Sequence, residues 1–306
     1  MKLGYYSYTT HIDHDVGDMH PEHPMRIIAI NHKLGQLGLL QDAYRGGSGL
    51  IAQQDLLRAH RAGYIDQLLL MSPASGTILA DEDTPMAVGS LRAAYQAAGC
   101  ALEALDDLLN NRVDRAFCAV RPPGHHAERS KAMGFCFLNN VAIAAKKAQF
   151  EYGLKRIAVI DFDVHQGNGT LDILANDPAY LICSSFQHPS YPFSHWRDIY
   201  SNVINTPLDE GSSGLYMRNA VESQWLKQLQ DFKPQLTIIS AGFDAHKADP
   251  MAKLEWQDED YAWLGRFISA INKEGVNNKI LAVLEGGYNL DALASSAASF
   301  ILAFQD

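Results

Sequence analysis

The sequence predicts an α/β fold, in which one domain spanning residues 1–306 is built on a central, mostly parallel β-sheet with helices on both faces. Short, uninterrupted apolar runs alternate along the chain with longer stretches of helical periodicity, as in parallel sheets buried on both faces. Hydrophobic residues make up 47% of the 306 residues and charged residues 20%, which is enough apolar side chain for a large core. No repeat, low-complexity tract or Pro/Ser-rich linker divides the chain.

The clearest helix signal covers residues 84–109. Apolar side chains recur there at steps of three and four, from Val88 to Leu109, which places them on one face of a helix. Thr84 is a typical helix cap, and Pro85 suits the first helical position. Further helices are expected at 139–151, 214–231, 258–274 and 290–304.

The expected strands are the short apolar runs at 116–120, 157–162, 180–186, 236–241 and 280–284. Polar residues stand at the carboxyl ends of four of these runs. In chain order these segments are RPPGHH (121–126), DFDVH (161–165), GFDAH (242–246) and EGGY (285–288). Ligands of open α/β sheets bind beyond the carboxyl ends of the strands, so we expect these four segments to form one site.

Three residues in these segments suit a metal ion. Asp163 and His165 alternate along an extended segment, so both side chains lie on the same face, and Asp244 can supply a third ligand. Three protein ligands leave one position open, which is typical of a catalytic zinc site. Two carboxylates and one imidazole also suit Fe(II) or Co(II). An isolated Asp-x-His pair would be explained by loop hydrogen bonds, but the three other polar segments favour metal binding.

Other residues of these segments suit proton transfer and charge stabilisation. His125 and His126 follow a stiff Pro-Pro-Gly turn and are candidates for general acid and base. Asp161 shares a face with Asp163 and is placed to orient an imidazole or an ion. Tyr288 follows two glycines and can donate a hydrogen bond to an oxyanion. Taken alone, Tyr288 is better explained as a buried aromatic residue.

Composition excludes several classes of function. The formal net charge is −10 and the pI is about 5.6, which argues against direct binding to nucleic acid. No run is long and apolar enough to cross a membrane, and the first residues lack the apolar core of a signal peptide. The cysteines are scattered and form no Cys-x-x-Cys pair, so we expect a cytoplasmic protein with reduced thiols. They are Cys100, Cys118, Cys136 and Cys183.

Five motifs together resemble the histone deacetylase family, which includes acetylpolyamine amidohydrolases and other bacterial amidohydrolases. They are RPPGHHA (121–127), GFCFLNNVAIAA (134–145), DFDVHQGNGT (161–170), AGFDAH (241–246) and EGGY (285–288). The likeness runs from His20 to the last predicted helix, and the motif sequences are closer to those of class II members than to those of class I. The resemblance implies an arginase/deacetylase-like fold.

The resemblance also implies roles for the residues at the reaction centre. Asp163, His165 and Asp244 would hold zinc. His126 would act as general base and then general acid, His125 with Asp161 as its electrostatic partner, and Tyr288 as the group that polarises the scissile carbonyl. Asn168 stands behind the second histidine, where many members carry aspartate. Gly167 replaces the last aspartate of the Asp-x-His-x-Asp run of arginases, so one catalytic metal is expected.

The resemblance implies further roles around the reaction centre. Phe135, Tyr191 and Met251 would line an acyl-lysine tunnel, Gly134 would offer its carbonyl to the substrate amide, and Asp83 would bind substrate backbone at the rim. Arg26 would line the inner cavity from which acetate departs. A potassium ion would be held by Asp161, the main-chain oxygens of Asp163 and His165, and Ser184. Acetylpolyamine-selective members tend to carry glutamate where Met251 falls.

We therefore expect zinc-dependent hydrolysis of N-acetyl amines, with an acetylated lysine peptide or protein as substrate. A second reading keeps the same scaffold but gives it acetylpolyamines, longer acyl-lysines or a small acylated metabolite. A third reading, from a different class, is an inactive module that binds acyl-lysine. A binding module has no need of a complete ligand set, two histidines and a tyrosine, so this set favours an enzyme.

Overall fold

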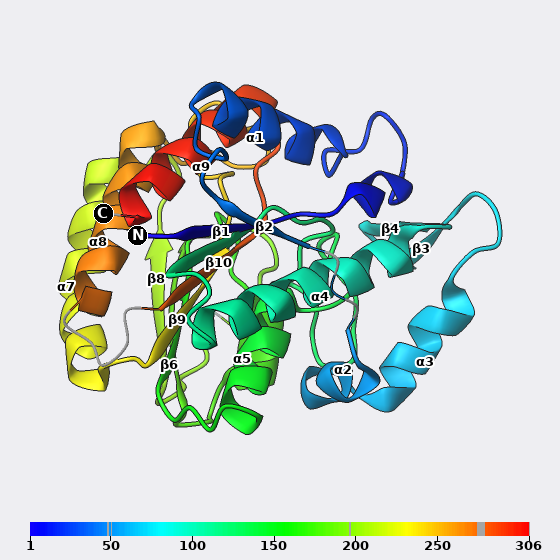
Figure 1. Ribbon diagram of the computed structural model, residues 1–306, viewed down its shortest axis with the longest axis horizontal. Coiled ribbons are helices and arrows are strands. Elements are labelled where there is room, and N and C mark those ends of the chain that lie inside the picture. The colour runs from blue at the N-terminus through cyan, green and yellow to red at the C-terminus, as the bar shows by residue number, and fades with distance from the viewer. Residues whose placement is uncertain (48, 50, 196, 274–278, 306) are drawn as a thin grey trace.

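The computed structural model describes residues 1–47, 49, 51–195, 197–273 and 279–305. Its centre is an eight-stranded sheet in the order β2-β1-β5-β10-β9-β6-β7-β8, in which every neighbouring pair runs parallel (Figure 1). The strands are β1 (Leu3–Tyr6), β2 (Tyr44–Gly46), β5 (Arg115–Cys118), β6 (Ile157–Asp161), β7 (Tyr180–Gln187), β8 (Val203–Leu208), β9 (Leu236–Ala241) and β10 (Ile280–Leu284). The predicted fold class is confirmed.

Helices cover both faces of this sheet (Figure 1). One face carries α1 (Met25–Gln36), α7 (Gly214–Phe232), α8 (Asp258–Lys273) and α9 (Leu290–Phe304). The other carries α2 (Gln53–Ala59), α3 (Ala62–Met71), α4 (Ser90–Leu109), α5 (Asn140–Phe150) and α6 (Asn168–Leu174). In β10, Leu281 and Val283 enter the core on the α4 side, whereas Ile280 and Ala282 enter the core on the α9 side. Burial on both faces explains why these strands read as bare apolar runs.

The predicted start of the 84–109 helix is wrong. Thr84 to Ala87 form strand β4, which pairs antiparallel with β3 (Thr77–Asp81), and helix α4 begins only at Ser90. The Thr84 hydroxyl is used as an acceptor by the Phe135 backbone N–H, at 3.2 Å, instead of capping a helix. Val88, expected on the buried helix face, is 56% exposed. A contact across 51 residues therefore outweighed a local capping signal.

The remaining predicted elements agree with the structure to within about two residues, and helix α9 matches its predicted range. Residue 274, at the end of the predicted 258–274 helix, and residue 306 lie outside the described residues. Strand β1 was not predicted, although it lies inside the sheet between β2 and β5. Its sequence is only Leu-Gly-Tyr-Tyr, and its two buried tyrosines hydrogen bond through their hydroxyls to Asn31 and Asp107.

The sheet order places the four polar segments side by side. They follow β5, β10, β9 and β6, and these four strands are consecutive in the sheet. Because the strands are parallel, their carboxyl ends meet at one edge, as the sequence predicted. The four segments therefore lie next to one another directly at the ends of their strands.

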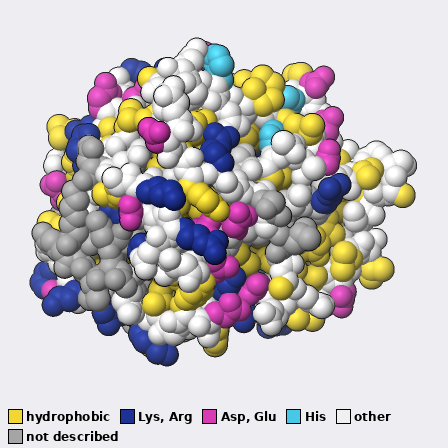
Figure 2. All heavy atoms as spheres, viewed as in Figure 1, with side chains coloured by type: hydrophobic (Ala, Val, Ile, Leu, Met, Phe, Trp, Pro, Cys, Tyr) yellow, Lys and Arg dark blue, Asp and Glu magenta, His cyan; other side chains and the backbone are white. Residues whose placement is uncertain are grey.

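The face of the molecule shown in Figure 2 carries lysine, arginine, aspartate and glutamate side chains in a mixed pattern. Hydrophobic side chains gather on this face over the region of α2 and α3 (Figure 2), where Leu69 and Leu70 are exposed. Among the described residues, none of the helices combines the length and the hydropathy needed to cross a membrane.

Candidate active site

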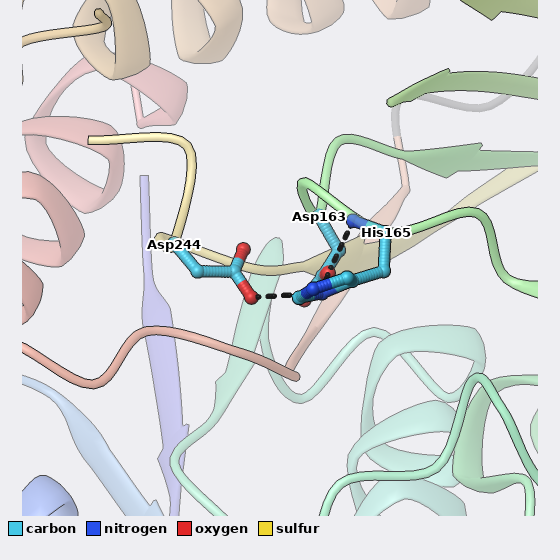
Figure 3. A group of neighbouring side chains, drawn as sticks. All are labelled: Asp163, His165 and Asp244. Atoms are coloured by element: carbon cyan, nitrogen blue, oxygen red, sulfur yellow. Dashed lines mark hydrogen bonds and ion pairs between the residues drawn. The ribbon is translucent and has the colours of Figure 1, made fainter. Parts of the chain in front are cut away.

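Asp163, His165 and Asp244 form a buried cluster just beyond the ends of β6 and β9 (Figure 3). One potential ligand atom from each lies within 4.8 Å of the others. His165 Nδ1 is 3.1 Å from Asp163 Oδ1 and 3.4 Å from Asp244 Oδ2. The predicted ligand set is thus brought together from two strands that are neighbours in the sheet.

The chemistry of this cluster fits a cation. Asp244 Oδ2 is buried and has no hydrogen-bond partner among the described residues. Within the same residues, neither carboxylate forms an ion pair with a lysine or an arginine. Two buried carboxylates without such a partner are costly unless a positive ion compensates them, and Asp and His are ordinary zinc ligands.

Two glycines allow the carboxylates to approach each other. A Cβ atom on Gly286 would lie 2.0 Å from Asp244 Oδ2 and 2.6 Å from Asp163 Oδ2. A Cβ atom on Gly242 would lie 2.1 Å from Asp163 Oδ2. Any side chain at either position would therefore displace a candidate ligand, which explains why glycine stands there.

The adjacent histidines meet different partners. His125 Nδ1 donates to Asp161 Oδ2 at 3.0 Å, and His125 Nε2 is 3.7 Å from Asp163 Oδ1. Burial acts to lower the pKa of His125, but the carboxylates of Asp163 and Asp161 outweigh it and raise this pKa well above the usual value. His125 is therefore placed as a positively charged group between two carboxylates.

Within the part of the chain that the structure describes, His126 has no carboxylate partner. Its Nδ1 lies 2.7 Å from Oδ1 of Asn168, whose Nδ2 donates to Glu128 Oε1 at 2.8 Å. Burial, together with the neighbouring imidazoles of His125 and His165, holds the pKa of His126 well below its usual value. Asn168 thus occupies the position behind the second histidine that the resemblance implied, and it orients the ring without adding charge.

Sequence reasoning missed the role of Glu285 in holding the histidine loop. Its buried Oε2 accepts the backbone N–H groups of Gly124 and His125, at 2.6 and 3.1 Å. Ser240 Oγ donates to the other oxygen at 3.3 Å. Burial raises the pKa of Glu285 to about 7. The sequence did offer a signal for this role, because Glu285 directly follows a bare apolar strand. A buried acid at such a position needs a hydrogen-bonding partner.

A pocket with a volume of about 250 Å³ opens above the cluster. It is lined by Asp83, His126, Gly134, Phe135, His165, Ser190, Tyr191, Met251 and Tyr288. All five residues expected to line the tunnel are therefore in the pocket, and Ser190 was not predicted. A larger cavity of about 770 Å³ lies between α1 and α9. It contains none of the cluster residues, so the smaller pocket is the candidate active site.

Aromatic rings form much of the pocket wall. The Phe135 ring packs edge-on against His20 and Tyr288, with centroid distances of 4.7 and 6.1 Å. The Tyr191 ring packs edge-on against His126 and His165, at 5.0 and 6.0 Å. These contacts give the pocket an apolar wall directly above a charged floor.

Asp83 and Gly134 meet at the rim of the pocket. The Gly134 N–H donates to Asp83 Oδ1 at 2.9 Å, and Thr84 Oγ1 donates to the same oxygen at 2.8 Å. The Asp83 carboxylate thereby holds the segment that leads into Phe135, which adopts a left-handed φ of 66°. The rim and the aromatic wall are thus parts of one hydrogen-bonded unit.

Arg26 lies beneath Tyr288, not among the residues that line the pocket. It is fully buried, and its guanidinium carbon is 5.0 Å from the centre of the Tyr288 ring. Its nitrogens donate to Gly287 O, Glu285 O and Glu22. Glu22 also binds Arg121 through both carboxylate oxygens and contacts His14. This buried network was not predicted, because hydrogen-bonded partners within it are up to 261 residues apart.

Ser184 stands beside Asp161 on the neighbouring strand, in register with it. Its buried hydroxyl has no hydrogen-bond partner among the described residues. Two of the residues that the resemblance implied for a potassium ion, Asp161 and Ser184, are therefore adjacent, and the Ser184 hydroxyl has an unused oxygen.

Comparisons with known proteins agree with this geometry. The family model of the histone deacetylase domain matches residues 20–304. Histone deacetylase 14, chloroplastic, of Arabidopsis thaliana is 35% identical over 316 residues, covering 96% of this chain and 74% of that protein. A histone deacetylase-like amidohydrolase of Pseudomonas aeruginosa is 34% identical over 245 residues, covering 78% of this chain and 64% of that protein.

A solved structure extends the comparison to the whole fold. The crystal structure of the HDA15 HD domain superposes with a TM-score of 0.92 at 30% sequence identity, covering 99% of this chain and 89% of that one. Sequence and structure thus give the same answer over almost all of the chain. The chain belongs to the histone deacetylase family of hydrolases and has the arginase/deacetylase fold.

Proposed function

We propose that residues 1–306 act as a single catalytic domain that hydrolyses N-acetyl amines with the help of zinc, and that acetyl-lysine in a peptide or protein is its substrate. One observation carries the proposal. A buried cluster of two carboxylates and one imidazole includes His165, which lines a pocket of about 250 Å³ together with His126 and Tyr288. The buried, unpaired cysteines are consistent with a cytoplasmic protein.

The donor set supports zinc. Asp163, His165 and Asp244 would hold the ion, and three protein ligands are typical of catalytic rather than structural zinc sites. Fe(II) and Co(II) accept the same ligands. A zinc ion bound there supplies Lewis-acid polarisation and lowers the pKa of water.

His126 is proposed as the general base and then the general acid. Because Asn168 Nδ2 donates to Glu128, the Asn168 oxygen must accept, so the proton on His126 resides on Nδ1. The other ring nitrogen, Nε2, is then the basic atom of a residue that lines the pocket. It would take a proton from the attacking water and return it to the departing amine.

Two further side chains would respond to charge as the reaction proceeds. The Tyr288 hydroxyl would donate a hydrogen bond to the developing oxyanion, while the Tyr288 ring is supported by Phe135 and Arg26. His125, held by Asp161, would balance negative charge close to the cluster. Asp161 with Ser184, and the main-chain oxygens of Asp163 and His165, would bind a potassium ion beneath it.

The shape of the pocket supports acetyl-lysine. A pocket walled by Phe135, Tyr191 and Met251 suits the apolar stem of a lysine side chain, which would displace water from the reacting carbonyl. The Gly134 carbonyl would receive the substrate amide N–H, and Asp83 at the rim would bind peptide backbone. Acetylpolyamines and longer acyl-lysines present the same amide, so they are the competing substrates to test.

The test is a turnover profile of zinc-loaded protein across acetyl-lysine peptides, acetylpolyamines and longer acyl-lysines. We expect the highest kcat/KM on acetyl-lysine peptides. Tyr288→Phe should lower kcat by roughly two to three orders of magnitude with little change in KM, because it removes only an oxyanion donor. Zinc content and melting temperature should stay close to those of the parent protein. Absence of hydrolysis of every acylated amine by fully metallated protein would refute the proposal.

A further inference from the structure

The peptide group between Gly287 and Tyr288 is held at both of its polar atoms by charged side chains. Arg26 Nε donates to the Gly287 carbonyl at 2.6 Å. The Tyr288 N–H donates to Asp249 Oδ2, also at 2.6 Å. The side chains of Arg26 and Asp249 therefore hydrogen bond to opposite sides of one peptide plane, the one directly before the Tyr288 side chain.

Asp249 connects the two loops that carry Asp244 and Tyr288. Its Oδ2 also accepts the N–H of Asn289 at 3.1 Å, and its Oδ1 accepts the N–H of Met251 at 3.0 Å. The side chain is only 7% exposed. One buried carboxylate thus accepts from three backbone N–H groups. Two belong to the tyrosine loop, and the third belongs to Met251, whose side chain lines the pocket.

The tyrosine loop needs such a hold. Gly286 and Gly287 precede Tyr288, and Gly287 adopts a φ of 119°, a conformation in the region that glycine favours. Glycines let the loop pass close to Asp244 and Asp163, but they offer little resistance to rotation of the next peptide plane. Rotation of that plane would redirect the Tyr288 ring, which is otherwise placed by contacts with Phe135 and Arg26.

We propose that Asp249 is a positioning residue that, opposite Arg26, fixes the Gly287–Tyr288 peptide plane and thereby aims the Tyr288 hydroxyl into the pocket. The inference rests on the proposed function for the role of Tyr288. Asp249 itself does not line the pocket, so its effect on turnover passes through the tyrosine. Misplacement of a reacting group by about 1 Å can lower a rate roughly 100-fold, so a residue outside the pocket can still govern kcat.

The test is a double-mutant cycle between Asp249 and Tyr288 in zinc-loaded protein. Asp249→Ala should lower kcat roughly 100-fold, with KM within about twofold of the parent value. Asp249→Asn should cost less, roughly tenfold, because its amide oxygen can still accept one N–H. In the Tyr288→Phe variant, adding either change at Asp249 should lower kcat by a further factor of less than about three. The hydroxyl that Asp249 positions is already absent from that variant.

Asp260→Asn is the matched control. Asp260 is also a buried aspartate that accepts a backbone N–H, from Gln257 at 2.8 Å, but its other bonded partner is Arg218, and it does not contact the tyrosine loop. It should lower the melting temperature about as much as Asp249→Asn while kcat stays near the parent value. Equal losses of kcat from Asp249→Asn in the presence and absence of the Tyr288 hydroxyl would overturn the inference, as would an equal loss from Asp260→Asn.

Amide hydrogen exchange gives a readout that does not depend on turnover. In Asp249→Asn the amides of Tyr288 and Asn289 should exchange faster, while those of Ala282 and Val283 in β10 stay protected. An unchanged exchange rate of the Tyr288 amide would overturn the proposed positioning role of Asp249, even if the chain hydrolysed no substrate. Failure of the proposed function shows instead as an inactive, metallated parent protein, so the two failures are distinguishable.

Discussion

The floor and the wall of the active-site pocket are built in different ways. We call the floor the buried group in which His126 and His165 line the pocket and His125, Asp163 and Asp244 contact these two histidines from below; all five follow strands of the central sheet. The wall consists of Phe135 and Tyr191, which are partly buried, and Met251, which is 37% exposed, and all three come from loops. Under the proposed function, we expect residues fixed by the rigid sheet to govern the reaction and residues on loops to govern which substrate fits.

The same contrast recurs within the floor, between two adjacent residues of one type. His125 is held by a carboxylate and His126 by a neutral amide, so their pKa values move in opposite directions. Groups driven apart in this way can serve different roles in acid–base chemistry. The following predictions test the division between floor and wall, and between the two histidines.

The largest effect is expected from removing a floor carboxylate. Asp244→Asn keeps the shape of the side chain and an oxygen that can accept the Val164 N–H, but it removes a charged ligand. We expect loss of bound metal and a fall in kcat of about 10³-fold, because Lewis-acid stabilisation is worth several kcal/mol. The metal-to-protein ratio and kcat are the measurements, with Asp260→Asn as control. One retained equivalent of metal at parental kcat would remove Asp244 from the ligand set.

The second prediction separates the two histidines. His126→Ala should lower kcat by roughly 10²- to 10⁴-fold while metal content stays near that of the parent, because His126 handles protons and is outside the ligand cluster. His125→Ala should lower kcat less. Single-turnover rates on an acetyl-lysine peptide, measured with metal content, decide the order. Equal losses from both variants would mean that the partners Asp161 and Asn168 do not set different roles.

The third prediction concerns the wall. Phe135→Ala should raise KM about tenfold and leave kcat within about threefold, because it removes apolar contact area that binds ground state and transition state alike. Phe193→Ala is the matched control, since Phe193 also has a left-handed φ, 60°, but is 71% exposed and does not line the pocket. If kcat falls by a larger factor than KM rises, Phe135 acts on the reaction itself, as we propose for the floor residues, and not only on substrate binding.

The smallest effect on turnover is expected in the packing that supports the pocket, where the change is one of stability. His60 Nε2 accepts the Asn139 N–H at 3.0 Å, and its Nδ1 donates to the Glu128 carbonyl at 3.0 Å, so the ring must be neutral. Burial lowers the pKa of His60 to about 4. The unfolded chain then binds more protons below pH 6.5, so stability should fall as pH drops from about 6.5 to 4.

The difference between a pKa of 6.5 and about 4 corresponds to a loss of about 3 kcal/mol across that range. His60→Gln keeps an acceptor and a donor but does not titrate. Its unfolding free energy should therefore vary less with pH between 6.5 and 4, whatever its stability at pH 7. Parallel pH dependence in the variant and the parent would show that His60 is already charged in the folded protein.

Local patterns determined the parts of this protein whose cause is local. The strands β6, β9 and β10 were predicted because side chains buried on both faces of a sheet leave a bare apolar run. The candidate metal-binding cluster followed from the alternation of Asp163 and His165 and from the rule that parallel strands end at one edge. Residues and spacing were enough to locate the floor of the pocket.

Tertiary structure decided the features whose partners are distant in sequence. The Thr84 hydroxyl accepts from Phe135 across 51 residues, Glu285 holds Gly124 across 161 residues, and Asp249 accepts from Tyr288 across 39. A hydrogen bond of this kind leaves no periodicity in the sequence, because its partner is fixed only when the whole chain has closed around the sheet. The sequence by itself therefore determined which polar residues would meet at one edge of the sheet, and the folded chain decided how they are held.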